Sequence, residues 1–246
     1  MADSQVFSES YKVTSYLVNL RGRAGLYTIL NFIQDVGWMH ARNADVKLAP
    51  GLGWVFTRQK LMMQEWPAWN ETVEIKTWLR QPEGPFVHRD YQLFTKNRQI
   101  GECTSSFTVM DMNTRKLAEQ DWSAYAHLWR RESQLQHKPE KILFQPGAQE
   151  LARFQVRNSD IDLNRHVNNT KYAQWILDAI PIDILREGQT LAAYEVNFLA
   201  ESKINDEISV QTVPEQENSD VLTIIQFQGA RLADQKPVFT AKLHVV

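Results

Sequence analysis

Apolar residues recur with a helical period in one early segment of the chain. Between Ala24 and Arg42 they recur at i, i+3, i+4, i+7 and i+10, as Leu26, Ile29, Leu30, Ile33 and Val36. This spacing gathers them on one face, so we predict an α-helix with a buried side. Four β-like runs follow, the second of which alternates strictly between apolar and polar positions. The runs are Trp54 to Glu65, Thr72 to Arg80, Val87 to Thr95 and Ile100 to Met110.

The same succession of patterns returns in the second half. A run from Asn169 to Ile180 has helical apolar spacing and ends at Pro181, which cannot continue a helix. Sliding the halves over one another superposes Asp35 on Asp178, so we predict an internal repeat. Four further β-like runs follow the second helix, at Leu191 to Ser202, Glu207 to Val213, Val221 to Gln228 and Pro237 to Val245.

The segment between the halves has a different composition. Residues 121–136 carry aromatic and apolar residues at helical spacing, and residues 137–150 are polar with two prolines, which predicts a linker with its own helix. We divide the chain into an N-terminal half (1–112), a linker (113–150) and a C-terminal half (151–246). The expected fold is α+β, a double hot-dog: two tandem repeats, each a long helix wrapped by an antiparallel sheet.

Composition narrows the class of protein further. With 246 residues, 43% of them hydrophobic, the chain can bury a substantial core. Lys and Arg number 27 against 29 Asp and Glu, which does not favour nucleic acid as a partner. The single Cys103 excludes an internal disulfide, and no apolar run resembles a signal peptide or a membrane span. We therefore expect a cytoplasmic protein that does not insert into membranes.

The densest polar cluster, Ser159 to Asn169, lies between a β-like run at Leu151 to Arg157 and the second helix. A calcium loop is excluded because Arg165 and Lys171 occupy its turn and bidentate positions. Helix capping explains Asn168. It does not explain three further residues, Asp162, Asn164 and His166.

These three residues form the candidate site. If the loop is extended, alternate side chains point to one side, beside the positive end of a helix. An acid, an amide and an imidazole there can supply a base, a dipole and a proton carrier. The first half has Asn19, Arg21 and Arg23 at this register, so the fold does not require the trio.

Other chemistries have weaker support. No G-x-S-x-G elbow is present, and Cys103 lies in the half without the trio. The six histidines show no paired spacing typical of zinc ligands, so we expect neither a metal nor a cofactor.

The cluster resembles the signature of the acyl-acyl carrier protein thioesterases of plants and bacteria. The resemblance covers Ser159 to Asn169, continues through Lys171-Tyr172 and Trp175 to Asp178, and extends to the two-half layout. It implies a double hot-dog enzyme that hydrolyses acyl-carrier thioesters and ends fatty acid synthesis. The family's catalytic positions fall on Asp162, Asn164, His166 and Glu201.

The fourth position depends on alignment, because Glu195 lies close to Glu201 in the same predicted strand. Plant members have a cysteine directly after the glutamate, whereas this chain has Ser202, so a cysteine mechanism cannot operate. The absence of a transit peptide favours a bacterial, cytoplasmic member.

The expected mechanism is attack by water on the thioester carbonyl, with Asp162 or Glu201 as general base. Candidate substrate contacts are Trp54, Met62, Asn168 and Ser202. The acyl chain needs an apolar pocket, which we expect in the first half, although the bulk of the apolar candidates are more typical of a core. These candidates are Leu61, Met62, Met63, Trp66, Trp69 and Trp78.

The expected partner is acyl carrier protein, which is strongly acidic and can be steered by basic side chains. The candidates for this role are Arg157, Arg165, Lys171 and Lys203. Alternatives are an acyl-CoA thioesterase, a hot-dog hydratase or dehydratase, and a non-catalytic acyl-binding module. The duplication allows a monomer or a homodimer.

Overall fold

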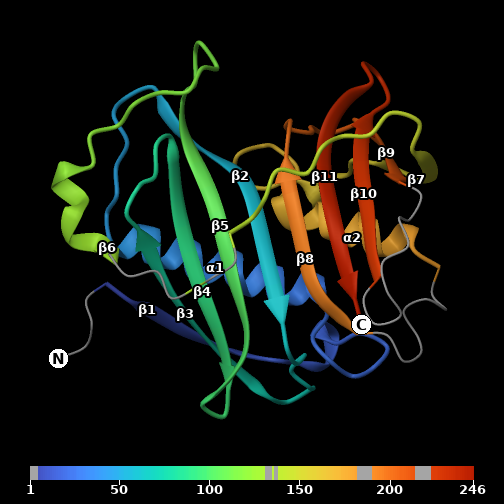
Figure 1. Ribbon diagram of the computed structural model, residues 1–246, viewed down its shortest axis with the longest axis horizontal. Coiled ribbons are helices and arrows are strands. Elements are labelled where there is room, and N and C mark those ends of the chain that lie inside the picture. Colours follow the sequence, from blue (N-terminus) through green and yellow to red (C-terminus); the bar gives the residue numbers. More distant parts are fainter. Residues whose placement is uncertain (1–4, 131–134, 136–137, 182–189, 214–222) are drawn as a thin grey trace. The chain divides into compact units, whose positions relative to one another are not determined.

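The computed structural model describes residues 5–130, 135, 138–181, 190–213 and 223–246. The chain divides into two compact units, Met1–Pro139 and Glu140–Val246. Each unit combines an α-helix with an antiparallel sheet (Figure 1). The division falls within the segment 113–150 that we predict as a linker. In the described parts of the chain, no helix has the length and apolar content needed to cross a bilayer.

The N-terminal unit is a sheet packed on helix α1 (Leu26–Asn43), which lies against β1 and β3. All five apolar residues that predict this helix are buried. The antiparallel strands run in the order β1-β3-β4-β5-β2. Their bounds are β1 (Phe7–Lys12), β2 (Leu52–Met63), β3 (Thr72–Arg80), β4 (Phe86–Thr95) and β5 (Arg98–Asp111).

The C-terminal unit repeats this plan around helix α2 (Asn169–Ala179), which lies against β7 and β9. Its strands run in the order β7-β9-β10-β11-β8 and are also antiparallel. Their bounds are β7 (Gln149–Gln155), β8 (Leu191–Phe198), β9 (Glu207–Thr212), β10 (Thr223–Arg231) and β11 (Lys236–Val245).

The two units connect their strands and helix in the same order. In each, the first strand is followed by the helix, and the strand after the helix lies at the opposite end of the sheet from the first strand. A left-handed asparagine recurs as well, two residues before a strand in each unit: Asn70 (φ 71°) before β3 and Asn205 (φ 68°) before β9. The predicted duplication and the double hot-dog fold are confirmed.

The linker differs from its prediction. In the described residues 121–130 the helix is a short 3₁₀ helix, η2 (Ser123–Leu128), which contains Tyr125 and has Trp122 as its N-cap. It stops there because the next two residues, Trp129–Arg130, form strand β6 and pair in parallel with β3. Trp129 and Trp122 pack in this region with Leu79 and Val87. Burial against the sheet, rather than helical period, therefore explains these aromatics. Residues 131–134 and 136 of the predicted helical segment lie outside the described residues, as do residues 221 and 222 of the predicted strand at 221–228.

Candidate active site

The polar cluster of the second half forms a closed turn. The backbone N–H of Asp162 donates to the carbonyl of His166 at 2.9 Å. The Asp162 carboxylate accepts the N–H of Asn164 at 2.8 Å, and Arg165 adopts a left-handed conformation with φ 62°. The premise of an extended loop is therefore wrong, because the chain turns back on itself between Asp162 and His166.

The first half contains the same turn with other side chains. The N–H of Asn19 donates to the carbonyl of Arg23 at 2.8 Å, and the Asn19 side chain accepts the N–H of Arg21 at 2.9 Å. Gly22, with φ 67°, holds the left-handed position. The turn thus needs an oxygen acceptor at its first position but no particular residue at its third or fifth. The residues matched in this way are Asn19 with Asp162, Arg21 with Asn164 and Arg23 with His166.

A second segment meets this turn from the loop after β8. The strand ends at Phe198 because the N–H groups of Leu199 and Ala200 both donate to the carbonyl of Val238, at 2.8 and 3.2 Å. Glu201 therefore lies in a loop and not on the strand where we expected it. The loop is joined to the turn by the N–H of Val167, which donates to the carbonyl of Ser202 at 2.9 Å.

This joint brings two side chains of the predicted site together. Nε2 of His166 lies 3.4 Å from Oε2 of Glu201, and the two side chains are 28% and 35% exposed. Water can therefore reach an imidazole and a carboxylate that are placed to exchange a proton. In the first half the same joint, from Ala24 N–H to Pro67 O at 2.8 Å, places Arg23 beside Trp66 instead.

The start of α2 lies directly after the turn. Asn168 is its N-cap, since its side-chain oxygen accepts hydrogen bonds from the N–H and the hydroxyl of Thr170, both at 3.0 Å. The aligned peptide dipoles of the helix make this end positive. An oxyanion that forms beside His166 would be stabilised there. The Asn168 side chain itself is engaged in capping.

The structure distinguishes the two glutamates of the β8 region. Glu195 is buried within β8, 3% exposed, and accepts the backbone N–H of Glu140. Its neighbour Asn197 holds the same segment, accepting from the N–H of Ile142 at 2.8 Å. Glu195 therefore serves to fasten the chain that enters the C-terminal unit, whereas Glu201 is the glutamate that faces His166.

Ser202 and Cys103, whose side chains are the kind that serve as nucleophiles in other enzymes, are both deeply buried. Ser202 has no exposed surface and lies against Tyr172. Burial raises the pKa of Tyr172 to about 12, and the contact with Ser202 opposes this rise. Cys103, in the other unit, is also buried, and burial raises the pKa of its thiol, which is the opposite of what an activated cysteine needs.

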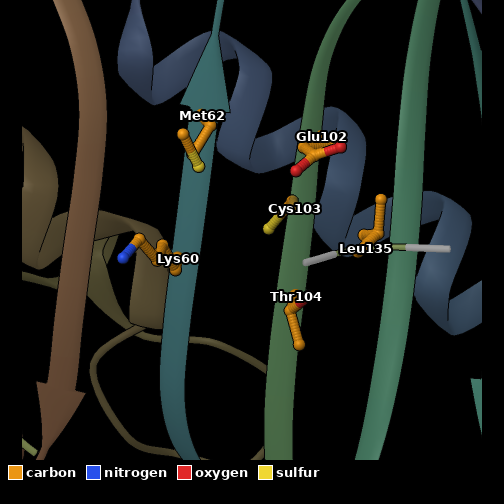
Figure 2. A pocket seen from close by; sticks show the side chains of 6 residues that line it. All are labelled: Lys60, Met62, Glu102, Cys103, Thr104 and Leu135. Atoms are coloured by element: carbon orange, nitrogen blue, oxygen red, sulfur yellow. The ribbon is translucent and has the colours of Figure 1, made fainter. Parts of the chain in front are cut away.

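The candidate acyl-chain contacts of the first half lie at its sheet. Met62 borders a shallow hollow on β2 and β5 (Figure 2). The hollow has no room for a water molecule and is therefore too small to hold an acyl chain. Trp54 is 41% exposed and stacks on Trp122, with ring centroids 5.4 Å apart. The side chains lining the hollow are Lys60, Met62, Glu102, Cys103, Thr104 and Leu135.

The other apolar candidates differ in burial, and this decides which of them belong to the core. Leu61, Met63 and Trp78 are core residues, as we expected for such side chains. Trp69 is 63% exposed and belongs to no core. Trp66 is half-buried, at the position that corresponds to Glu201.

Three of the four basic candidates are exposed: Arg157, Arg165 and Lys203. Lys171 is engaged, since its amine lies 3.5 Å from the buried carboxylate of Asp160 and donates to Gln174 at 3.1 Å. The turn and its flanks therefore present positive charge to solvent.

Two residues that support the site were not identified from the sequence as parts of it. Asp160 is 7% exposed; its carboxylate accepts the N–H of Arg157 at 2.8 Å and its carbonyl that of Asn168 at 2.8 Å. Arg231, at the end of β10, donates to the carbonyl of Glu201 at 3.2 Å. The signal for Arg231 was the acid three residues later, Asp234, with which it forms a bidentate ion pair.

Fold and site together define a double hot-dog protein whose second repeat alone carries an imidazole–carboxylate pair beside a helix start. The chain matches two family models, the acyl-ACP thioesterase N-terminal domain over residues 4–123 and the acyl-ACP thioesterase C-terminal domain over residues 145–240. It belongs to the acyl-ACP thioesterase family.

Curated relatives and solved structures agree with this assignment. The chain is 26% identical over 259 residues to oleoyl-acyl carrier protein thioesterase 2 of Arabidopsis thaliana, covering 96% of this chain and 70% of that protein. It is 26% identical over 246 residues to the oleoyl-acyl carrier protein thioesterase of Coriandrum sativum, covering 91% of this chain and 66% of the relative. An acyl-ACP thioesterase from Bacteroides thetaiotaomicron has the same fold, with a TM-score of 0.87, 23% identity and full coverage of both chains.

Proposed function

We propose that this chain hydrolyses the thioester of a fatty acyl group carried by acyl carrier protein, releasing the free acid and the carrier thiol. The proposal rests on one observation above all: His166 contacts Glu201 at 3.4 Å in the second half. The corresponding residues of the first half, Arg23 and Trp66, cannot form such a pair. The names of the curated relatives, which are acyl carrier protein thioesterases, support the substrate class.

In the proposed reaction, the oxygen of a water molecule adds to the thioester carbonyl carbon while Glu201 accepts the proton of that water. The negative charge moves to the carbonyl oxygen, where the positive end of the α2 dipole stabilises it. Collapse of this intermediate breaks the C–S bond. The departing thiolate takes a proton from His166, which regains it from Glu201.

Two observations favour Glu201 over Asp162 as the base. One oxygen of Asp162 accepts a backbone N–H within the turn, the task that Asn19 performs in the first half. The Asp162 carboxylate is thus already engaged in shaping the turn. Glu201 has no carboxylate counterpart in the first half, because Trp66 occupies its place. In this proposal Asp162 shapes the turn, and Asn164 orients the reacting groups.

The decisive experiment compares isosteric variants with acyl carrier protein substrates, measuring release of free thiol. Glu201→Gln is expected to lower kcat by about 10²- to 10⁴-fold, the usual contribution of a general base. Asp162→Asn keeps the turn's acceptor and is expected to lose less. A larger loss in Asp162→Asn than in Glu201→Gln would assign the base to Asp162 while leaving the thioesterase function intact.

The matched control is Arg23→Ala, which changes the position corresponding to His166 in the half without the pair. It is expected to retain kcat, whereas His166→Ala loses it. Failure of the wild-type protein to release thiol, with the acyl thioester bound and intact, would replace hydrolysis by acyl binding. Faster turnover of acyl-CoA than of acyl carrier protein would change the substrate class, and product of hydration without thiol would indicate a hydratase.

A division of labour between the units also belongs to this proposal. Residues 151–246 would perform the chemistry and residues 1–112 would hold the acyl chain, with Trp54 and Met62 as contacts. Asn168, as the cap of α2, and the fully buried Ser202 would support the reacting region rather than touch the substrate.

A further inference from the structure

In each half, one backbone hydrogen bond joins the turn to a neighbouring loop: Ala24 N–H to Pro67 O in the first half and Val167 N–H to Ser202 O in the second. The carbonyl of the residue before this acceptor is bound by an arginine in both halves, but the two arginines come from different elements. In the first half, Arg23 of the turn donates to the carbonyl of Trp66. In the second half, the corresponding carbonyl belongs to Glu201, and the turn position holds His166, whose imidazole faces the Glu201 side chain instead. The task of holding this carbonyl therefore passes to another residue in the second half.

Arg231 performs that task from the end of β10. Its guanidinium donates to the Glu201 carbonyl at 3.2 Å and to the Asp206 carboxylate at 3.3 Å. Asp206 also accepts the N–H of Lys203 at 2.8 Å, which closes the turn that follows Glu201. One arginine thus fixes both ends of the loop 201–206.

The guanidinium is itself held in place. Asp234, in the hairpin between β10 and β11, accepts from Nε at 3.0 Å and from a terminal nitrogen at 2.8 Å. The Arg231 side chain is only 17% exposed, so its geometry is restricted by packing as well. In β4 of the first half, the corresponding residue is Thr95, which is buried.

We propose that Arg231 is a positioning residue for catalysis: it holds the backbone of Glu201 in the place where the carboxylate meets His166. This inference rests on the proposed function of Glu201. An arginine at the turn, as in the first half, would occupy the space that the imidazole needs. The transfer of carbonyl binding from the turn to β10 is what makes room for the His166–Glu201 pair.

The test measures kcat, KM and thermal stability for Arg231→Met, alone and combined with Glu201→Gln. A misplacement of a reacting group by about 1 Å costs on the order of 10²-fold in rate. We expect Arg231→Met to lower kcat by about this factor with KM for acyl carrier protein changed less than about threefold. In the Glu201→Gln background the same change is expected to lower kcat little further, because Arg231 acts by positioning a carboxylate that this variant no longer has.

The matched control is Lys96→Met, which breaks the ion pair of Lys96 with Glu71 at 2.9 Å. Glu71 closes the corresponding turn of the first half by accepting the N–H of Ala68 at 2.9 Å. This variant is expected to retain kcat. A loss in Lys96→Met equal to that in Arg231→Met would show a general effect of loosening the sheet ends.

Wild-type kcat in Arg231→Met, or an equal loss with and without Glu201→Gln, would overturn the inference. If Glu201→Gln alone retains wild-type activity, the proposed function of Glu201 fails instead, so the two failures are distinguishable. Should Arg231→Met be too unstable to assay, Asp234→Asn takes its place, because it removes the bidentate anchor and keeps the guanidinium. The same loss of kcat and the same dependence on Glu201 are then expected, and their absence counts against the inference.

Discussion

His40, near the end of α1 in the N-terminal unit, is a buried histidine that the fold keeps neutral. It is 5% exposed, stacks on Phe7, and its Nδ1 accepts a hydrogen bond from the guanidinium of Arg89 at 2.6 Å. Burial, with a smaller effect of the positive Arg89, lowers the pKa of His40 to about 4. Protonation would place two cations side by side in the interior.

The pH dependence of stability follows from this lowered pKa. Above pH 6.5, His40 is neutral in the folded and unfolded chains, and the contribution is fully present. As the pH falls from 6.5 towards 4, the unfolded chain binds a proton that the folded chain does not, so stability is lost. The full difference is about 3 kcal/mol, of which about 2 kcal/mol is lost by pH 5.

Denaturant unfolding at pH 7 and pH 5 checks this prediction. His40→Gln keeps an acceptor for Arg89 but cannot be protonated, so its free energy of unfolding is expected to fall less between the two values than that of the wild type. His88, whose pKa is also lowered by burial, leaves part of the slope in place. Equal slopes in the variant and the wild type would contradict the assignment.

Among the secondary-structure elements, the start of α2 invites a direct test of the role of Asn168. We considered this residue both as a cap and as a substrate contact, and its side-chain oxygen accepts two hydrogen bonds from Thr170. Loss of a cap costs about 1 kcal/mol. Asn168→Ala is therefore expected to lower the free energy of unfolding by this amount.

Asn168→Ser separates the two roles, because serine caps helices as well as asparagine but offers no amide. We expect Asn168→Ser to have near-wild-type stability and kcat, measured by denaturant unfolding and by thiol release. A loss of kcat in Asn168→Ser with unchanged stability would establish the residue as a substrate contact instead.

The elements that could be predicted from the sequence are those with a strong period. Apolar spacing located α1 and α2 to within two residues, because both helices bury one face. Strand β1 was missed, since it is only six residues long and alternates between half-buried and exposed positions with just two aromatics, Phe7 and Tyr11, to mark its inner face. A short strand at one end of a sheet leaves little hydrophobic signal.

The site was predictable in composition but not in conformation. The trio was found because the first half lacks it, and Glu201 because of family resemblance. The closed turn was missed because Arg165 has a positive φ, which is uncommon outside glycine. The first half held the clue, since Gly22 at the matching position has the same conformation. Long-range contacts such as Arg231 to Glu201 depend on tertiary packing that local patterns do not encode.

For the whole molecule, duplication means that one repeat preserves the fold while the other is free to carry chemistry. The two halves share the turn, the joint and the connectivity, yet only the second joins an imidazole to a carboxylate. The first half is therefore a built-in reference for every substitution in the second. This is why matched controls such as Arg23→Ala and Lys96→Met exist within one chain.

In the proposed function, an acidic carrier protein docks on the catalytic half. The net charge of −2 does not favour this encounter, so local positive charge near the site must provide the attraction. Arg165 and Lys203 are exposed on the turn and on the loop that meet at the proposed site. Attraction between opposite charges speeds the encounter and weakens with salt. We expect Arg165→Glu/Lys203→Glu to raise KM for acyl carrier protein by about tenfold and to abolish most of its salt dependence.

A small acyl thioester without a carrier provides the internal standard, because its hydrolysis needs the same catalytic groups but no docking surface. The double variant is expected to hydrolyse it at the wild-type rate. Arg153→Glu/Lys236→Glu makes the same change of charge at other exposed positions of this unit and is expected to leave KM for the carrier unchanged. An equal rise in KM in both double variants would mean that the carrier responds to total charge, and the surface around the turn would then have no special part in docking.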